Sequence, residues 1–182
     1  MILPIMALGQ PVLKKIASPI KADYEGLDQL IENMWETMYN AKGIGLAAPQ
    51  IGRSIRLFMV DTEQFEELEV PGIKKVFINA EILSEEGEPW VYEEGCLSIP
   101  KINGEVMRRE SVTIRYMDEQ FLEYTETYDD MNARVIQHEY DHIDGILFTE
   151  LLKPLKRRLL SRKLDNIRKG KISPEYKMKF KL

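Results

Sequence analysis

The sequence predicts an α+β protein in which mainly antiparallel strands surround a central helix, with further helices toward the two ends of the chain. Two observations carry this prediction. Apolar residues recur at helical spacing near both ends, and extended segments lie between them, in the order helix, strands, helix, helix. With 182 residues, 44% of them apolar, residues 1–182 are expected to form one domain with a sizeable core.

The first helix is predicted over residues 24–42. Gly43 lies where such a helix can stop, because glycine adopts the backbone conformation that ends many helices. Its apolar residues at helical spacing are Leu27, Leu30, Ile31, Met34 and Met38.

Extended segments follow at residues 55–60, 75–79 and 90–92. Residues 111–116 alternate in polarity, as in a half-buried strand. Residues 121–128 are its expected hairpin partner, across the turn at 117–120.

A second helix is predicted from about Asp130, with Met131, Val135 and Ile136 on its apolar face. We expect this central helix to be buried against the strands. A third helix, over about residues 153–169, is expected to pack its leucines against the body and to present its basic side chains outward. Its apolar residues are Leu155, Leu159, Leu160, Leu164 and Ile167.

Charge is distributed unevenly along the chain. Residues 153–182 hold 12 Lys and Arg against two acidic residues, a net +10, and the rest carries −15, for a total of −5. A basic helix and tail on an acidic body predicts contact with a polyanion. A solvated helix whose charge offsets that of the body explains the pattern equally well.

Cys96 is the only cysteine, so no internal disulfide can form, which suits a reducing compartment. The N-terminus lacks a basic leader, and no apolar run approaches the roughly 18 residues of a membrane span. We therefore expect a cytoplasmic protein that does not contact the membrane.

Both histidines of the chain lie in one short motif, His138-Glu139-x-x-His142. Four residues of helix bring the two imidazoles to one face about a turn apart, where both can reach one metal ion. Glu139 lies between them, next to where a bound water would be. The same pattern also occurs by chance on the polar surface of a capped helix, so a third ligand is needed.

Two residues compete for the third position. Cys96, in the stretch EEGCLSIP, is a strong zinc or iron ligand once deprotonated, and Gly95 permits close backbone approach. A lone cysteine is more often a small buried apolar residue. A zinc endopeptidase of the His-Glu-x-x-His type needs a carboxylate on a following helix, and Asp165 is the nearest candidate, although neighbouring basic residues would compete for it.

A third stretch, GIGLAAPQ at residues 43–50, combines glycines with a terminal amide. Gln50 can donate a hydrogen bond to a developing oxyanion, and a tight turn before a strand is the simpler interpretation. Together, GIGLAAPQ, EGCLS and QHEYDH resemble the three signature motifs of the peptide deformylase family, in the family's order and with similar separations. The resemblance extends to the flanks, including GQPVLKKIASPI. The loop 101–104 and the tail after Gly170 look particular to this chain.

The resemblance implies removal of the formyl group from N-formylmethionine of newly made polypeptides, with release of formate. Cys96, His138 and His142 would then bind one divalent metal ion, with iron(II) favoured and zinc, nickel or cobalt also suited to such ligands. Glu139 would accept a proton from water and deliver it to the departing amine. The Gln50 amide and the Leu97 backbone N–H would stabilise the oxyanion.

The substrate backbone is expected to lie as an added strand near Ile44, Gly45 and Gly95. Arg108 is expected to pair with Glu94 or Asp141 beneath the site, and a solvated arginine is the alternative. The candidates for the methionine pocket, each of which could instead be ordinary core, are Ile44, Trp90, Tyr92, Met131 and Val135.

Three other functions remain open from the residues alone. They are the zinc endopeptidase, a thiol hydrolase in which Cys96 attacks and a histidine is the base, and an RNA-binding module with a structural metal. The expected partners are N-formylmethionyl nascent peptides, with the ribosome a candidate partner through the basic C-terminal helix.

Overall fold

The computed structural model describes residues 1–65 and 70–181. In this part of the chain an antiparallel sheet has the strand order β2-β3-β4-β5-β6, and a small parallel sheet joins β1 to β7. The strands are β1 (Ile5–Met6), β2 (Gly45–Ala47), β3 (Leu57–Asp61), β4 (Lys74–Cys96), β5 (Ile99–Met117), β6 (Glu123–Asp129) and β7 (Met178–Lys179). The helices are α1 (Leu27–Asn40), α2 (Asp130–Ile143) and α3 (Pro154–Arg168), with short 3₁₀ turns η1 (Pro11–Lys14), η2 (Ala48–Ile51) and η3 (Phe148–Glu150).

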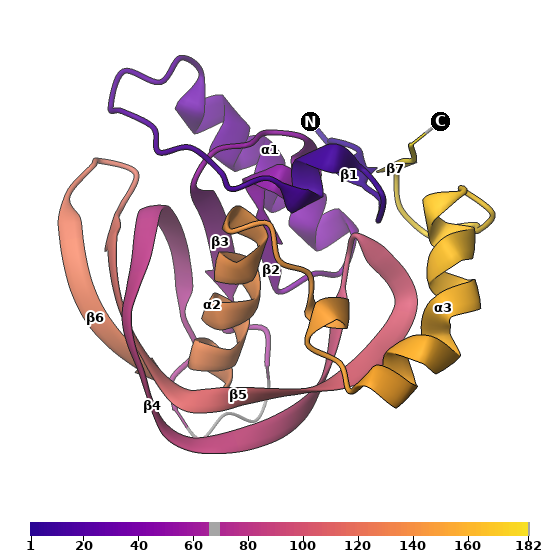
Figure 1. Cartoon of the computed structure of the whole chain (residues 1–182). Coiled ribbons are helices and arrows are strands. Elements are labelled where there is room, and N and C mark those ends of the chain that lie inside the picture. Colours follow the sequence, from indigo (N-terminus) through magenta and orange to yellow (C-terminus); the bar gives the residue numbers. More distant parts are fainter. Residues whose placement is uncertain (66–69, 182) are drawn as a thin grey trace.

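The expected α+β fold is confirmed, and α2 is its central helix. Figure 1 shows α2 enclosed by the curved sheet, with α1 on one side and α3 near the two termini. Ala133, Ile136 and Ile143 of α2 are buried in one apolar cluster with side chains of the sheet such as Phe77 and Ile114. Burial of this face fixes α2 against the sheet, and it thereby fixes the positions of the other residues of the helix.

The strands differ from expectation in one respect. Residues 75–79 and 90–92, predicted as separate segments, belong to one long strand, β4, which pairs with β5 along most of its length. Polar, exposed residues between them conceal this continuity in the sequence. Register shifts at several points, including one between Glu86 and Pro89, are irregularities of the kind that bend and twist a ladder. The hairpin formed by β5 and β6 is confirmed.

The prediction for the third helix is wrong for two of its leucines. Leu155 and Leu159 are 71% and 72% exposed, whereas Leu164 and Ile167 are buried. Leu164 and Ile167 belong to the apolar cluster that contains Ile99 of β5, and the partly buried Leu160 packs against it. Leu155 and Leu159 lie nearer the start of α3, outside this cluster. The described helices include none that is both long and apolar enough to cross a membrane.

Candidate metal centre

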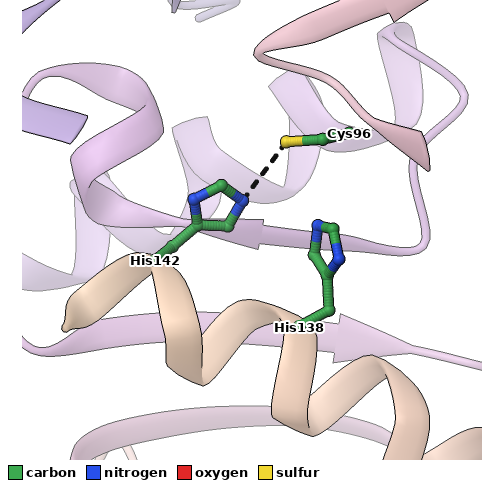
Figure 2. A group of neighbouring side chains, drawn as sticks. All are labelled: Cys96, His138 and His142. Carbon is green, nitrogen blue, oxygen red and sulfur yellow. Dashed lines mark hydrogen bonds between the residues drawn. The ribbon is translucent and has the colours of Figure 1, made fainter. Parts of the chain in front are cut away.

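Cys96, His138 and His142 come together from two elements. Cys96 is the last residue of β4, and the two histidines lie one turn apart on α2. One potential ligand atom from each of the three lies within 4.8 Å of the others, and Cys96 Sγ is 3.3 Å from His142 Nε2. Figure 2 shows both imidazoles directed from the helix toward the thiol. Donors of this kind at this separation can share one ion.

Glu94 orients the first histidine. Its Oε2 lies 2.9 Å from His138 Nδ1, which leaves Nε2 of the same ring available as a metal ligand. Arg108 donates two hydrogen bonds to Glu94, at 2.6 and 3.1 Å, and a third to Asp141 at 2.8 Å. The expected pairing of Arg108 is therefore confirmed with both partners. Burial raises the pKa of the Glu94 carboxyl, but hydrogen bonds from His138 and Arg108 outweigh it and hold that pKa well below its ordinary value.

Two buried polar atoms at this site lack hydrogen-bond partners among the side chains around them. Within the described residues, neither His142 Nδ1 nor Glu139 Oε2 has a hydrogen-bond partner. Buried polar groups are almost always satisfied, and an unsatisfied pair of this kind is typical of a site that holds an ion or water. Sulfur and nitrogen donors suit a transition metal, so these residues fit a divalent ion of the zinc or iron(II) type.

Glu139 lies on the cavity side of α2 but is almost fully buried, at 4% exposure. Burial raises the pKa of its carboxyl to about 7, in the range where a carboxylate exchanges protons readily at neutral pH. The carboxylate presses against β2, where a Cβ at Gly45 would overlap it. Glycine at position 45 thus lets the strand backbone approach the proposed base.

These groups border a cavity of about 600 Å³. The cavity extends from the entry to β2, past the β4–β5 turn and α2, to the C-terminal segment. Among the residues proposed for the site, those that line it are Ile44, Gly45, Gln50, Tyr92, Gly95, Cys96, Leu97, Met131, Val135, His138 and Glu139. His142 lies behind them, buried at 1% exposure.

Trp90 is the predicted pocket residue that the structure does not bring to the cavity. Its ring is covered by the guanidinium of Arg134, whose Cζ is 4.3 Å from the ring centroid, and it also contacts Tyr92. Trp90 therefore supports the wall from behind. Trp90 and Tyr92 are two residues apart in an unbroken stretch of β4, so they share one face of the strand, but Arg134 of α2 covers the Trp90 ring. That cover comes from a distant element and cannot be read from the sequence of the strand.

Gln50 directs the donor end of its amide toward the site. Its Oε1 accepts a hydrogen bond from the Ala47 N–H at 2.8 Å, which fixes the orientation of the group. Nε2 consequently faces Cys96 Sγ at 3.5 Å and Ser98 Oγ at 3.3 Å. A side-chain N–H held beside Cys96 is well placed to meet negative charge on a substrate.

Sequence reasoning missed two contributors. Arg134 is buried on α2 and donates to Glu94 Oε1 at 2.9 Å. Its position four residues before His138, on the same helix face, was a signal that could have found it. Tyr176 lines the cavity and donates to the Leu97 carbonyl at 2.6 Å. No local pattern in the tail indicates that contact.

The three Cys and His donors converge beside a cavity, and a buried glutamate borders the same cavity. This arrangement is that of a mononuclear metallohydrolase. Asp165, the competing carboxylate, is instead paired with Lys169 on the exposed side of α3, so the endopeptidase alternative is not favoured.

Comparisons with known proteins agree with this class. The family model for polypeptide deformylase matches residues 2–158, and the chain belongs to that family. The peptide deformylase of Christiangramia forsetii is 56% identical over 99% of this chain and 96% of its own length, and that of Flavobacterium johnsoniae is 52% identical over the same shares. A crystal structure of a peptide deformylase from Legionella pneumophila is 40% identical, with a TM-score of 0.82 over 94% of this chain and 98% of that one.

Proposed function

We propose that this chain hydrolyses the formamide bond of N-formylmethionine at the start of newly synthesised polypeptides, releasing formate. Family membership and the close relatives named peptide deformylase support the activity. The observation that carries the assignment of residues is the convergence of Cys96, His138 and His142 beside Glu139 at one wall of the cavity. We also infer that residues 1–182 act as one catalytic domain, since the same curved sheet encloses the site and α2.

Metal binding is assigned to Cys96, His138 and His142. A divalent ion at these residues supplies a Lewis acid that lowers the pKa of water. Iron(II) is the favoured ion, and zinc, nickel or cobalt also suit one thiolate and two imidazoles. Glu94 keeps the His138 ring in place, and Arg108 keeps Glu94 in place.

Proton transfer is assigned to Glu139. Its carboxylate takes a proton from the attacking water, whose oxygen bonds to the formyl carbon, and returns the proton to the methionine nitrogen as the C–N bond breaks. Gln50 Nε2 and the Leu97 backbone N–H donate to the formyl oxygen while it carries negative charge. The burial of Glu139 and the fixed orientation of the Gln50 amide support these roles.

The peptide is proposed to bind as an added strand along β2. Among the described residues this strand is at the edge of the sheet, with β3 as its one neighbour in the strand order. The Ile44 carbonyl accepts from the Asp61 N–H of β3, so the backbone groups of the next residue, Gly45, face the free edge. Gly95 also lines the cavity.

The methionine side chain is proposed to enter an apolar part of the cavity. Ile44 contributes from the residue just before β2, Tyr92 from β4, and Met131 and Val135 from successive turns of α2. Because a formyl group has only hydrogen on its carbon, a crowded site at Glu139 and Gly45 favours formyl over acetyl substrates.

The decisive experiment is formate release from formyl-Met-Ala-Ser by protein purified without oxygen, with metal content measured on the same sample. Acetyl-Met-Ala-Ser is the substrate control. We expect release of formate only from the formyl peptide and its loss in the presence of a chelator. Chelator-resistant activity would favour Cys96 as a nucleophile instead.

Glu139→Gln tests the proton-transfer role separately from metal binding. The amide keeps the size of the side chain but cannot accept the proton, so we expect full metal content and roughly 10²–10⁴-fold lower kcat. Glu88→Gln, at an exposed position of β4, is the matched control and should match the wild type. Near wild-type turnover by Glu139→Gln would assign the base elsewhere.

Two finer proposals concern location. We propose that the protein acts in the cytoplasm, where its nascent-chain substrates arise. We also propose that the basic face of α3 docks on the ribosome, since its Lys and Arg residues are exposed and ribosomal RNA is a polyanion. The residues of this face are Arg157, Arg158, Arg162, Lys163, Arg168 and Lys169.

A further inference from the structure

The C-terminal segment returns to the cavity after α3. Its strand β7 pairs in parallel with β1, and the N–H groups of Ile5 and Ala7 donate to the carbonyls of Lys177 and Lys179, both at 2.9 Å. Figure 1 shows the two ends of the chain lying together on this side of the molecule. The pairing fixes the chain immediately after Tyr176.

Tyr176 makes a specific contact with the turn that follows Cys96. Its hydroxyl donates a 2.6 Å hydrogen bond to the Leu97 carbonyl, and its side chain is half-buried at the cavity wall. Leu97 is the first residue of the two-residue turn between β4 and β5, in which Cys96 pairs with Ile99. The hydroxyl therefore holds the residue whose N–H is the proposed oxyanion donor.

The other hydrogen bonds to this turn hold a different residue from the one that Tyr176 holds. The Leu8 N–H donates to the Ser98 carbonyl at 2.9 Å, and Gln50 Nε2 donates to Ser98 Oγ at 3.3 Å. Both of these contacts hold Ser98. Tyr176 holds the peptide group on the other side of the Ser98 Cα, next to Leu97. With both peptide groups bonded, rotation of the turn is restricted.

We propose that Tyr176 is a positioning residue for deformylation: by holding the Leu97 carbonyl, it keeps the Leu97 N–H directed at the reacting formyl oxygen. The C-terminal segment, which lies beyond residues 2–158 that match the family, is thus a working part of the active site. This inference rests on the proposed function. Donors fixed before the reaction stabilise developing charge better than mobile ones, because they need no reorganisation during the step.

Tyr176→Phe tests the inference, since it removes one oxygen and retains the ring. We expect kcat to fall about three- to ten-fold, the range of one neutral hydrogen bond, with KM, metal content and thermal midpoint unchanged. Amide hydrogen exchange over residues 96–99 should become faster. Tyr24→Phe, at a half-buried tyrosine outside the cavity lining, is the matched control and should change none of these.

Formate release by the wild type is measured first, because its absence would overturn the proposed function itself. Given an active wild type, unchanged kcat and unchanged exchange in Tyr176→Phe would overturn the positioning role alone. A fall in activity that merely follows a loss of metal or of thermal stability would also overturn it, since the tail would then act only on the fold.

Discussion

Glu94→Gln should destabilise the fold and weaken metal binding through one buried carboxylate. Glu94 is 5% exposed and accepts from His138 Nδ1, from Arg108 twice and from Arg134. The amide of glutamine keeps one acceptor oxygen and replaces the other with a donor. In either orientation, donors of the neighbouring side chains then face an NH₂ group.

The expected loss follows from these contacts. Each Glu94 oxygen accepts two of the hydrogen bonds, so two charge-assisted bonds are lost, at about 1.5–3 kcal/mol each. This agrees with the roughly 3–5 kcal/mol expected when a buried ion pair loses one partner. Metal affinity should also fall about 10–100-fold, because an uncharged amide replaces the carboxylate that orients the His138 ring.

Urea unfolding of the metal-free proteins gives the first quantity, and competition with a chromogenic chelator gives the second. Glu81→Gln is the matched control, since Glu81 also pairs with an arginine, Arg115, but on the surface, where side-chain exposures are 57% and 46%. That control should lose less than about 1 kcal/mol and keep its metal affinity. Equal losses in the two variants would refute the buried network as a source of stability.

The other predictions concern turnover and location. Gln50→Ala should lower kcat by about 10²–10³-fold with little change in KM, because the amide acts on the oxyanion. A change confined to KM would instead assign Gln50 to substrate binding. Replacing Arg157, Arg158, Arg162 and Lys163 with glutamate should abolish co-sedimentation with ribosomes at low salt, while free formyl-Met-Ala-Ser is hydrolysed at the wild-type rate. Undiminished co-sedimentation would return this face of α3 to a simple solvated surface.

Local periodicity was sufficient for the three helices, for several of the strands and for the histidine motif of the site. The α2 helix and the β5–β6 hairpin follow from the spacing of apolar residues, since each pattern reflects neighbours a few residues apart. The same locality placed His138 and His142 on one helix face, with Glu139 beside them. Cys96 and Gln50 needed the resemblance of whole motifs, because a lone cysteine or amide carries no geometry of its own.

Only the tertiary structure decided which distant residues serve the site. Arg134 and Glu94 meet across α2 and β4, and Tyr176 reaches Leu97 across 79 positions of sequence. Trp90 was assigned to the pocket from its residue type, but the fold placed it beneath Arg134. In α3, helical spacing identified the apolar stripe, yet Leu155 of that stripe is exposed because its part of the helix does not pack against the rest of the described chain. Sequence patterns determine which face of an element is apolar, whereas burial and long-range hydrogen bonds depend on what the folded chain brings against that face.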